Sequence, residues 1–146
     1  MEPQMDTDEH RLNAVSERVI GCSYAVANAL GHGFLEKVYE NALAYEFRSN
    51  GLRVEAQKGF AVRYRDVVVG EYVADLLVEN LVLVELKAIK EFDDVHLAQC
   101  LNYLKAAGLP LCLLINFGTP KIRVKRIVGP FYPCSSVSIC GSNDPC

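Results

Sequence analysis

The sequence has no surplus of basic residues, no long apolar run and no paired-cysteine motif. Each of these absences excludes a class of protein. Lysine and arginine total 15 against 18 acids, and the net charge of −3 disfavours avid nonspecific binding of nucleic acid, although a local basic patch is compatible with it. No apolar stretch is long enough to cross a bilayer, and the polar, acidic start has the features of neither a signal nor a transit peptide. We therefore expect a cytoplasmic protein without membrane contact.

The six cysteines include no CxxC pair, which argues against the common zinc-binding and redox motifs. Cys22, Cys100 and Cys112 fall within helix or strand patterns, where free cysteines behave as small buried apolar residues. Cys134, Cys140 and Cys146 are evenly spaced near the end, without a neighbouring histidine. A metal site or disulfides among these last three cysteines are both compatible with their spacing.

A chain of 146 residues with 51% hydrophobic and 23% charged residues suits one globular domain with one core. We expect a disordered lead over residues 1–10, the domain over 11–129, and a loose tail rich in Cys, Ser and Pro over 130–146. Changes in hydrophobic period predict the order α-α-β-β-β-α-β-β, an α/β fold whose mixed sheet is flanked by helices. The expected helices are Leu12–Leu30, Leu35–Asn50 and Val95–Ala107, and the expected strands are Arg53–Arg65, Val67–Val78, Leu81–Ala88, Leu111–Phe117 and 121–128.

Three ionisable residues interrupt the apolar strands at the centre of this pattern: Asp75, Glu85 and Lys87. A buried charge costs several kcal/mol unless a partner compensates it. Two partners are compatible with the pattern. Lys87 could pair with an acid, or two carboxylates could hold a divalent metal with the lysine beside it. Because side chains alternate along a strand, Glu85 and Lys87 share one face.

The turn between the two strands decides whether the carboxylates meet. A three-residue turn centred on Asn80 places Asp75 opposite Glu85, whereas a two-residue turn at Glu79-Asn80 places Asp75 opposite Val84 and requires a bulge. The sequence is compatible with both turns.

Several further runs occur in a fixed order along the chain: Gly33-Phe34-Leu35-Glu36-Lys37-Val38-Tyr39, then GEYVADLLVE, LVLVELKA, HLAQCLNYLKA and LLINFG. In this set the chain resembles the GxxExxY family of the PD-(D/E)xK nuclease-like superfamily. The resemblance implies a single-domain αβββαβ core with Asp75, Glu85 and Lys87 as metal and catalytic residues. It also implies a Mg²⁺ (or Mn²⁺) cofactor, further metal ligands from Glu36 and the Leu86 carbonyl, and a nucleic-acid substrate, either DNA or RNA.

Two helical pairs are further candidates for the site. Glu36 and Tyr39 lie one turn apart on one face, although an acid at a helix start is also favoured by the helix dipole alone. Gln99 and Tyr103 also share a face, and QCLNY is similar to the Q-x-x-x-Y motif beside the active site of RecB-type exonucleases. On pattern alone, Gln99 and Tyr103 also fit a half-buried amphipathic helix. His96 lies one turn before Gln99 and could face the same cleft.

Basic residues alternate on the last strand, where Lys121, Arg123 and Lys125 project from one face with Arg126 adjacent. Arg63 and Arg65 form a smaller group of this kind. Such a stripe can bind phosphates, or it can protect a sheet edge against pairing with another sheet.

Two functions from different classes follow. The first is a Mg²⁺-dependent nuclease with Lys87 activating water and Gln99, Tyr103, Tyr39 and the basic residues binding substrate. The second is a catalytically silent nuclease-fold module that serves as a nucleic-acid-binding, metal-binding or assembly scaffold. A transition-metal site using His96 is a third hypothesis. The long segment from Gly59 to Val78 also offers an edge for a homo-oligomer.

Overall fold

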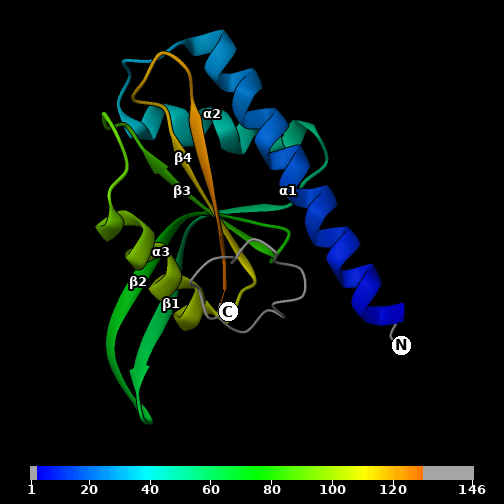
Figure 1. Ribbon diagram of the computed structural model, residues 1–146, viewed down its shortest axis with the longest axis vertical. Coiled ribbons are helices and arrows are strands. Elements are labelled where there is room, and N and C mark those ends of the chain that lie inside the picture. Colours follow the sequence, from blue (N-terminus) through cyan, green and yellow to red (C-terminus); the bar gives the residue numbers. More distant parts are fainter. Residues whose placement is uncertain (1–2, 130–146) are drawn as a thin grey trace.

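The structure, a computed structural model, describes residues 3–129. Its elements follow the expected order (Figure 1). They are α1 (Pro3–Leu30), α2 (Glu36–Ser49), β1 (Val54–Tyr64), β2 (Val67–Val78), β3 (Val82–Lys87), α3 (Asp94–Ala107), β4 (Leu111–Asn116) and β5 (Arg123–Val128).

The five strands form one mixed sheet in the order β1-β2-β3-β4-β5. Only β3 and β4 run parallel, and the other neighbouring pairs are antiparallel. A parallel pair needs a long crossover, which α3 supplies. All six residues of β4 are buried, which confirms its predicted central place in the sheet.

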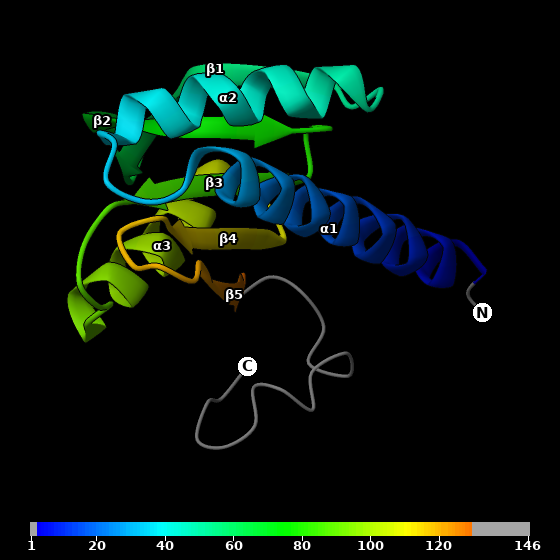
Figure 2. The ribbon, with the colours of Figure 1, turned by 90° about the horizontal axis from the view of Figure 1, so that it is seen from above.

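Helices cover both faces of the sheet. Helices α1 and α2 pack side by side on one face (Figure 2), and their core includes Val19, Tyr39 and Phe47. Helix α3 covers the opposite face, where Cys100 and Leu104 pack against Leu83, Cys112 and Leu114. Because helices cover both faces of the central strands, polar groups on β3 lie in a largely dehydrated environment.

Helix α1 is longer than the sequence pattern predicts. Of the apolar positions that the sequence repeats at helical spacing, Leu12, Val15, Val19, Cys22 and Val26 are buried, whereas Ala29 is exposed. The helix, however, begins at Pro3, so the structure differs from the expected disordered lead over residues 1–10. Proline suits the first helical position, and neither glycine nor proline interrupts residues 4–20.

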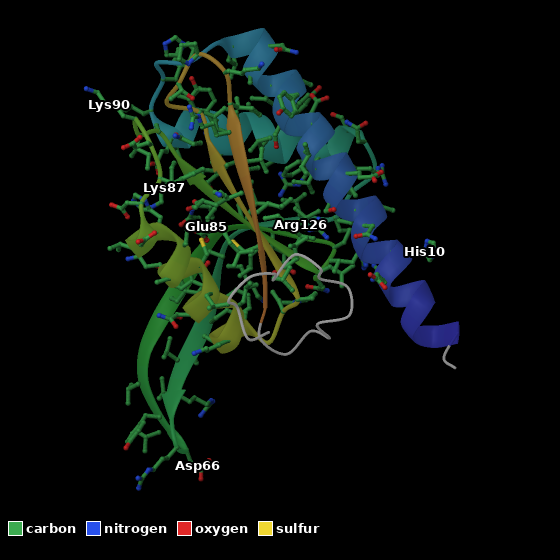
Figure 3. The ribbon with its side chains drawn as sticks, in the orientation of Figure 1. His10, Asp66, Glu85, Lys87, Lys90 and Arg126 are labelled. Atoms are coloured by element: carbon green, nitrogen blue, oxygen red, sulfur yellow. The ribbon has the colours of Figure 1, made fainter. Side chains whose placement is uncertain are left out.

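The β1–β2 hairpin extends beyond α3 and ends in a turn at Arg65-Asp66 (Figures 1 and 3). Strand β1 is interrupted at Gln57, whose φ is 55°. Beyond this point the buried side chains change faces, since Leu76 packs toward α1 and α2 whereas Ala74 packs toward α3. The break lies beside Asp75, which has no backbone ladder partner in either neighbouring strand.

No helix in the described residues is long and apolar enough to cross a membrane. The predicted tail, residues 130–146, and the hypotheses on Cys134, Cys140 and Cys146 lie outside the described residues. Within 3–129, Cys22, Cys100 and Cys112 are buried free thiols, as expected.

Candidate active site

The β2–β3 turn has three residues. Leu77 pairs with Leu83 and Val78 with Val82, which leaves Glu79, Asn80 and Leu81 in the turn. The same register, continued beyond the last ladder pair of Leu76 with Val84, brings Asp75 opposite Glu85. Of the two turns that the sequence allows, the one that makes the carboxylates converge is present, and no bulge is needed.

Where β2 and β3 separate, the carboxylates of Asp75 and Glu85 take the place of the backbone-to-backbone hydrogen bonds between the strands. The amide of Leu86 donates to Asp75 Oδ2 over 2.8 Å, and the amide of Asp75 donates to Glu85 Oε2 over 3.3 Å. Each carboxylate therefore uses one oxygen to hold the opposite strand. The other oxygens, Asp75 Oδ1 and Glu85 Oε1, accept no hydrogen bond from residues 3–129.

Tyr72 fixes Glu85 from the α3 side. Its hydroxyl donates to Glu85 Oε2, and its ring stacks on Tyr103 of α3 with centroids 3.6 Å apart. Phe60 of β1 stacks on Tyr72 as well, at 5.9 Å. Burial and the Glu85 charge raise the pKa of Tyr72 far above its usual value, so this hydroxyl stays a donor over the physiological range.

Burial makes the two acids hard to ionise together. Desolvation and the neighbouring Asp75 charge raise the pKa of Glu85 to about 7, and Glu85 is only 8% exposed. Desolvation also raises the pKa of Asp75, an effect opposed by the Leu86 amide and reinforced by the charges of Glu40 and Glu36. A group that brings positive charge between the two carboxylates would relieve both effects.

Lys87 is not part of a structural ion pair. The ion pairs within 4 Å in the described part of the chain involve other bases, so the alternative of a Lys87–acid bridge is not observed. Lys87 is half-buried and pairs in register with Asn116, which pairs with Arg123. Glu85, Lys87 and Arg123 therefore lie on the α3 face of the sheet. Figure 3 shows Glu85 and Lys87 following each other along β3.

Two acids of α2 lie at the margin of the site. Glu36 is exposed in the first turn of α2, and its charge reaches Asp75 without joining it in a carboxylate cluster. Glu40, one turn later, is 6% exposed and binds Lys37 Nζ at 3.1 Å and Gln57 Nε2 at 3.0 Å. Glu40 and Gln57 thus tie α2 to the irregular position of β1 beside Asp75.

The structure places Tyr39, a predicted substrate-binding residue, in the core. Its side chain is fully buried, stacked on Phe117 at 4.3 Å. Its hydroxyl donates to the Gly31 carbonyl at 2.6 Å and accepts from the Phe34 amide at 3.2 Å. Tyr39 is instead the anchor of the α1–α2 loop, an outcome that the helical spacing alone could not distinguish.

Helix α3 contributes Tyr103 but not His96. Tyr103 reaches the site through its stack on Tyr72, and Gln99 is exposed one turn earlier on the same face. His96 Nδ1 instead accepts from the Asp93 amide at 3.1 Å, while the Asp93 carboxylate accepts from the Val95 and His96 amides. This capping box occupies His96, so the hypothesis of a metal site using His96 is not supported.

The basic residues divide into three groups. Lys121, Arg123 and Lys125 are exposed, and Arg123 and Lys125 lie on the β5 edge strand, on the same sheet face as Glu85. Arg126 points the other way, to Ser16 Oγ at 3.0 Å and Asn13 Oδ1 at 3.2 Å on α1 (Figure 3). Arg63 and Arg65 lie near the hairpin tip, away from Glu85, so the structure does not bring them into the site.

Asn116 holds the chain that leaves β3. It is fully buried at the end of β4, accepts from the amides of Ile89 and Gly118, and donates to the Ile89 carbonyl. A Cβ on Gly118 would lie 2.3 Å from the Ile89 nitrogen, so this approach requires glycine. Asn116 therefore sets the path of the residues that directly follow Lys87.

The chemistry of the donor set fits a hard divalent cation. No group of three or more His, Cys, Asp or Glu side chains in residues 3–129 is placed to hold a metal, so Asp75 and Glu85 act as a pair. Magnesium binds through one or two carboxylates together with waters and substrate phosphates. Two neighbouring carboxylates, each with one oxygen that has no partner among residues 3–129, in a site whose acids repel each other, match that requirement.

Three residues around the site escaped the sequence analysis: Tyr72, Glu40 and Asn116. Each is a polar group at a buried position of an apolar pattern, and such groups need hydrogen-bond partners. That mismatch is the signal that could have identified them. The partners themselves lie 13, 17 and 27 residues away and are not visible in a local pattern.

Comparison with known proteins extends these observations. The family model described as the PD-(D/E)XK nuclease superfamily matches residues 13–127. No curated protein matches the chain. A solved structure titled "Crystal structure of SSO0001" is similar with a TM-score of 0.52 at 16% identity, over 68% of this chain and 52% of that one. This chain thus spans about half of that protein's length, and at this identity the likeness concerns the fold alone.

Proposed function

This chain belongs to the PD-(D/E)XK nuclease superfamily, and we propose that it is a Mg²⁺-dependent nuclease that hydrolyses phosphodiester bonds of nucleic acid. One observation supports this proposal above the others. Asp75 and Glu85 converge where β2 and β3 part, and each presents an oxygen that no residue of the described chain satisfies. The narrower assignment to the GxxExxY family, based on Gly33, Glu36 and Tyr39, is part of the same proposal.

The carboxylates of Asp75 and Glu85, with the Leu86 carbonyl, would hold the cation, and Glu36 would contribute from the margin. When bound, Mg²⁺ would supply a bound water of lowered pKa and compensate charge on the phosphate. Tyr72 keeps Glu85 in place by donating to Oε2, which would leave Oε1 for the cation. Lys87 orients the attacking water or neutralises charge that develops on the phosphate.

Substrate binding falls to residues around this centre. Gln99 offers an exposed amide on the same face of α3 as Tyr103, suited to a phosphate oxygen. Arg123 and Lys125 lie on the sheet face of Glu85, and Arg123 is two strands from Lys87, about 10 Å at the usual strand spacing. With Lys121 they provide a local basic surface despite the net negative charge.

The cellular setting is also part of the proposal. Cys100 and Cys112 are free thiols that interact with each other across α3 and β4. We propose that the protein works in the cytoplasm, a reducing compartment in which such neighbouring thiols stay reduced. The exposed Val67, Val68 and Val69 at the hairpin favour association into a homo-oligomer.

The test is cleavage of single- and double-stranded DNA and RNA by purified protein, with Mg²⁺, with Mn²⁺ and with EDTA. We expect cleavage that requires the metal and is lost in Asp75→Asn and Lys87→Ala. Asp66→Asn at the hairpin tip (Figure 3) and Lys105→Ala on α3 are matched controls that keep activity. Both residues are exposed, and Lys105 lies beside Ala61, Val62 and Arg63 of the hairpin. Metal-dependent binding without turnover on any substrate would contradict the proposal and favour the non-catalytic module.

A further inference from the structure

Two apolar side chains are exposed beside the candidate active site, on the loop that joins α1 to α2. Phe34 is 48% exposed and Leu35 is 79% exposed. The helical pattern places Leu35 in a buried stripe, but α2 begins at Glu36 and leaves Leu35 outside the core. Both side chains line a surface hollow of about 470 Å³, together with His32, Gly33, Glu36, Ala88 and Gly118.

The loop holds Phe34 in this exposed position. The Tyr39 hydroxyl bonds to the Phe34 amide and to the Gly31 carbonyl, and the Tyr39 ring is fixed by its stack on Phe117. Gly33 has a φ of 115°, which a residue with a side chain rarely adopts. The Phe34 and Tyr39 rings meet in a T-shaped arrangement with centroids 6.1 Å apart, and the 48% exposure of Phe34 leaves part of its ring open to a partner.

The far wall of the hollow is formed by the residues that follow β3 and β4. Ala88 follows Lys87 directly, and Gly118 lies against Ile89 through the Asn116 hydrogen bonds. Glu36, a proposed metal ligand, also lines the hollow. The hollow therefore lies next to residues of the candidate site, so a nucleic-acid strand bound at the site would pass close to Phe34.

Two exposed lysines follow closely on the wall of this hollow along the chain. Lys90 is two residues after Ala88 and Lys121 three residues after Gly118, whereas Lys37 pairs with Glu40 and the acid Glu36 lines the hollow itself. Lys90 and Lys87 lie at the same end of the sheet (Figure 3). An apolar, aromatic floor with cations at its rim matches a nucleotide, whose base is apolar on its faces and whose phosphates are anionic.

We propose that the hollow receives an unpaired nucleobase of the substrate strand, stacked on Phe34 with Leu35 beside it, next to the phosphate that is cleaved. The identity of the occupant rests on the proposed nuclease function. Stacking on an aromatic ring accepts any base, because every base has a π face. A base inside a duplex cannot present that face, so the protein prefers single strands or frayed ends of DNA or RNA.

The first test is binding of labelled single-stranded oligonucleotides, measured by fluorescence anisotropy in EDTA so that no cleavage occurs. Phe34→Ala should raise the Kd about tenfold or more, as expected for loss of one base–aromatic stack. Tyr45→Ala is the matched control. Tyr45, on α2, is 73% exposed and does not line the hollow, so its loss should leave the Kd unchanged. Oligonucleotides of DNA and of RNA distinguish the two sources of the base.

The second test uses the absence of tryptophan from this chain. Phe34→Trp introduces a single tryptophan whose fluorescence should be quenched by an oligonucleotide with bases and much less by one whose sugars carry no bases. Tyr45→Trp provides a reporter that should not respond. Because Phe34→Trp keeps an aromatic face, it should also retain the wild-type Kd.

The results separate this inference from the proposed function. Equal Kd values for wild type and Phe34→Ala, or quenching that is the same with and without bases, would overturn the stacking site even if the protein cleaves nucleic acid. Phe34-dependent binding of unpaired bases would support it even if no cleavage is found. Tighter binding of duplex than of single strands by wild type would also contradict it.

Discussion

The hydrogen bond from Tyr72 to Glu85 makes a sharp prediction, because its removal should affect the protein differently at different pH. Phe at position 72 keeps the ring and therefore its stacks on Tyr103 and Phe60. Only the donor to Glu85 Oε2 is lost. Tyr72→Phe thus isolates one bond to one carboxylate in a buried site.

The size of the effect depends on the charge of Glu85. A hydrogen bond to a charged group contributes about 1.5–3 kcal/mol, and one between neutral groups about 0.5–1.5 kcal/mol. The pKa of Glu85 is about 7 in the native state, so the group is charged at pH 8.5 and protonated at pH 5. We expect Tyr72→Phe to lower the free energy of unfolding by about 1.5–3 kcal/mol at pH 8.5 and by about half as much at pH 5.

Urea unfolding in EDTA at both pH values measures this difference, and Tyr64→Phe, an exposed tyrosine of the same hairpin, is the matched control. The same bond favours ionised Glu85, so its loss raises the pKa of that carboxyl further. In the nuclease assay the acid limb of the pH profile should therefore move to higher pH. A destabilisation of equal size at pH 5 and pH 8.5 would refute the coupling of Tyr72 to a titrating Glu85.

Three further predictions concern the same region. In EDTA, the free energy of unfolding of the wild type should fall as pH rises from about 4.5 to about 7. Native Glu85 keeps its proton in that range while the unfolded chain loses it, and this difference in pKa corresponds to about 3 kcal/mol of the free energy of unfolding. In urea unfolding, Glu85→Gln should remove most of this dependence on pH. Gly118→Ala should lower the rate of cleavage strongly because its Cβ would meet Ile89, whereas Gly70→Ala, with open space around it, should leave the rate unchanged. Equal cleavage rates for the two variants would refute the role of the close approach between Gly118 and Ile89. Asn116→Ala should lower the free energy of unfolding by about 2–4 kcal/mol because it leaves three buried backbone groups at Ile89 and Gly118 without partners, while Asn116→Asp keeps two acceptor bonds and should lose less, as thermal unfolding would show.

The sequence predicts the elements and their order because hydrophobic period is a local property. The bounds of β2 are the same in the prediction and in the structure, and β4 is buried throughout as its apolar run indicates. The fold follows from these segments and the superfamily resemblance together. The local hydrophobic period does not predict the start of α1 at Pro3 or the exposure of Leu35, because both depend on where a helix begins.

The register that brings Asp75 opposite Glu85 could not be read from the sequence, for a physical reason. The three-residue turn places Glu79 and Asn80 at φ 54°, a conformation common for asparagine but costly for glutamate. Contacts with Arg53, the residue directly before β1, compensate: the Glu79 carboxylate accepts from the Arg53 amide at 2.6 Å, and the Glu79 amide donates to the Arg53 carbonyl at 2.9 Å. A residue 26 positions away thus selects the turn.

The candidate site and the stability of the fold make opposing demands on the same two residues. Apolar side chains at positions 75 and 85 would suit the doubly covered sheet, and the present acids instead repel each other in a dehydrated setting. Their strand-to-strand hydrogen bonds recover only part of this cost, since each carboxylate leaves one oxygen without a partner among residues 3–129. A cation that binds only the native state would recover more, by an amount that grows with its concentration relative to its Kd. On the proposed function, the energetic cost of the pair without metal is what would favour a divalent ion here, and this is why we propose that Asp75 and Glu85 are functional rather than structural.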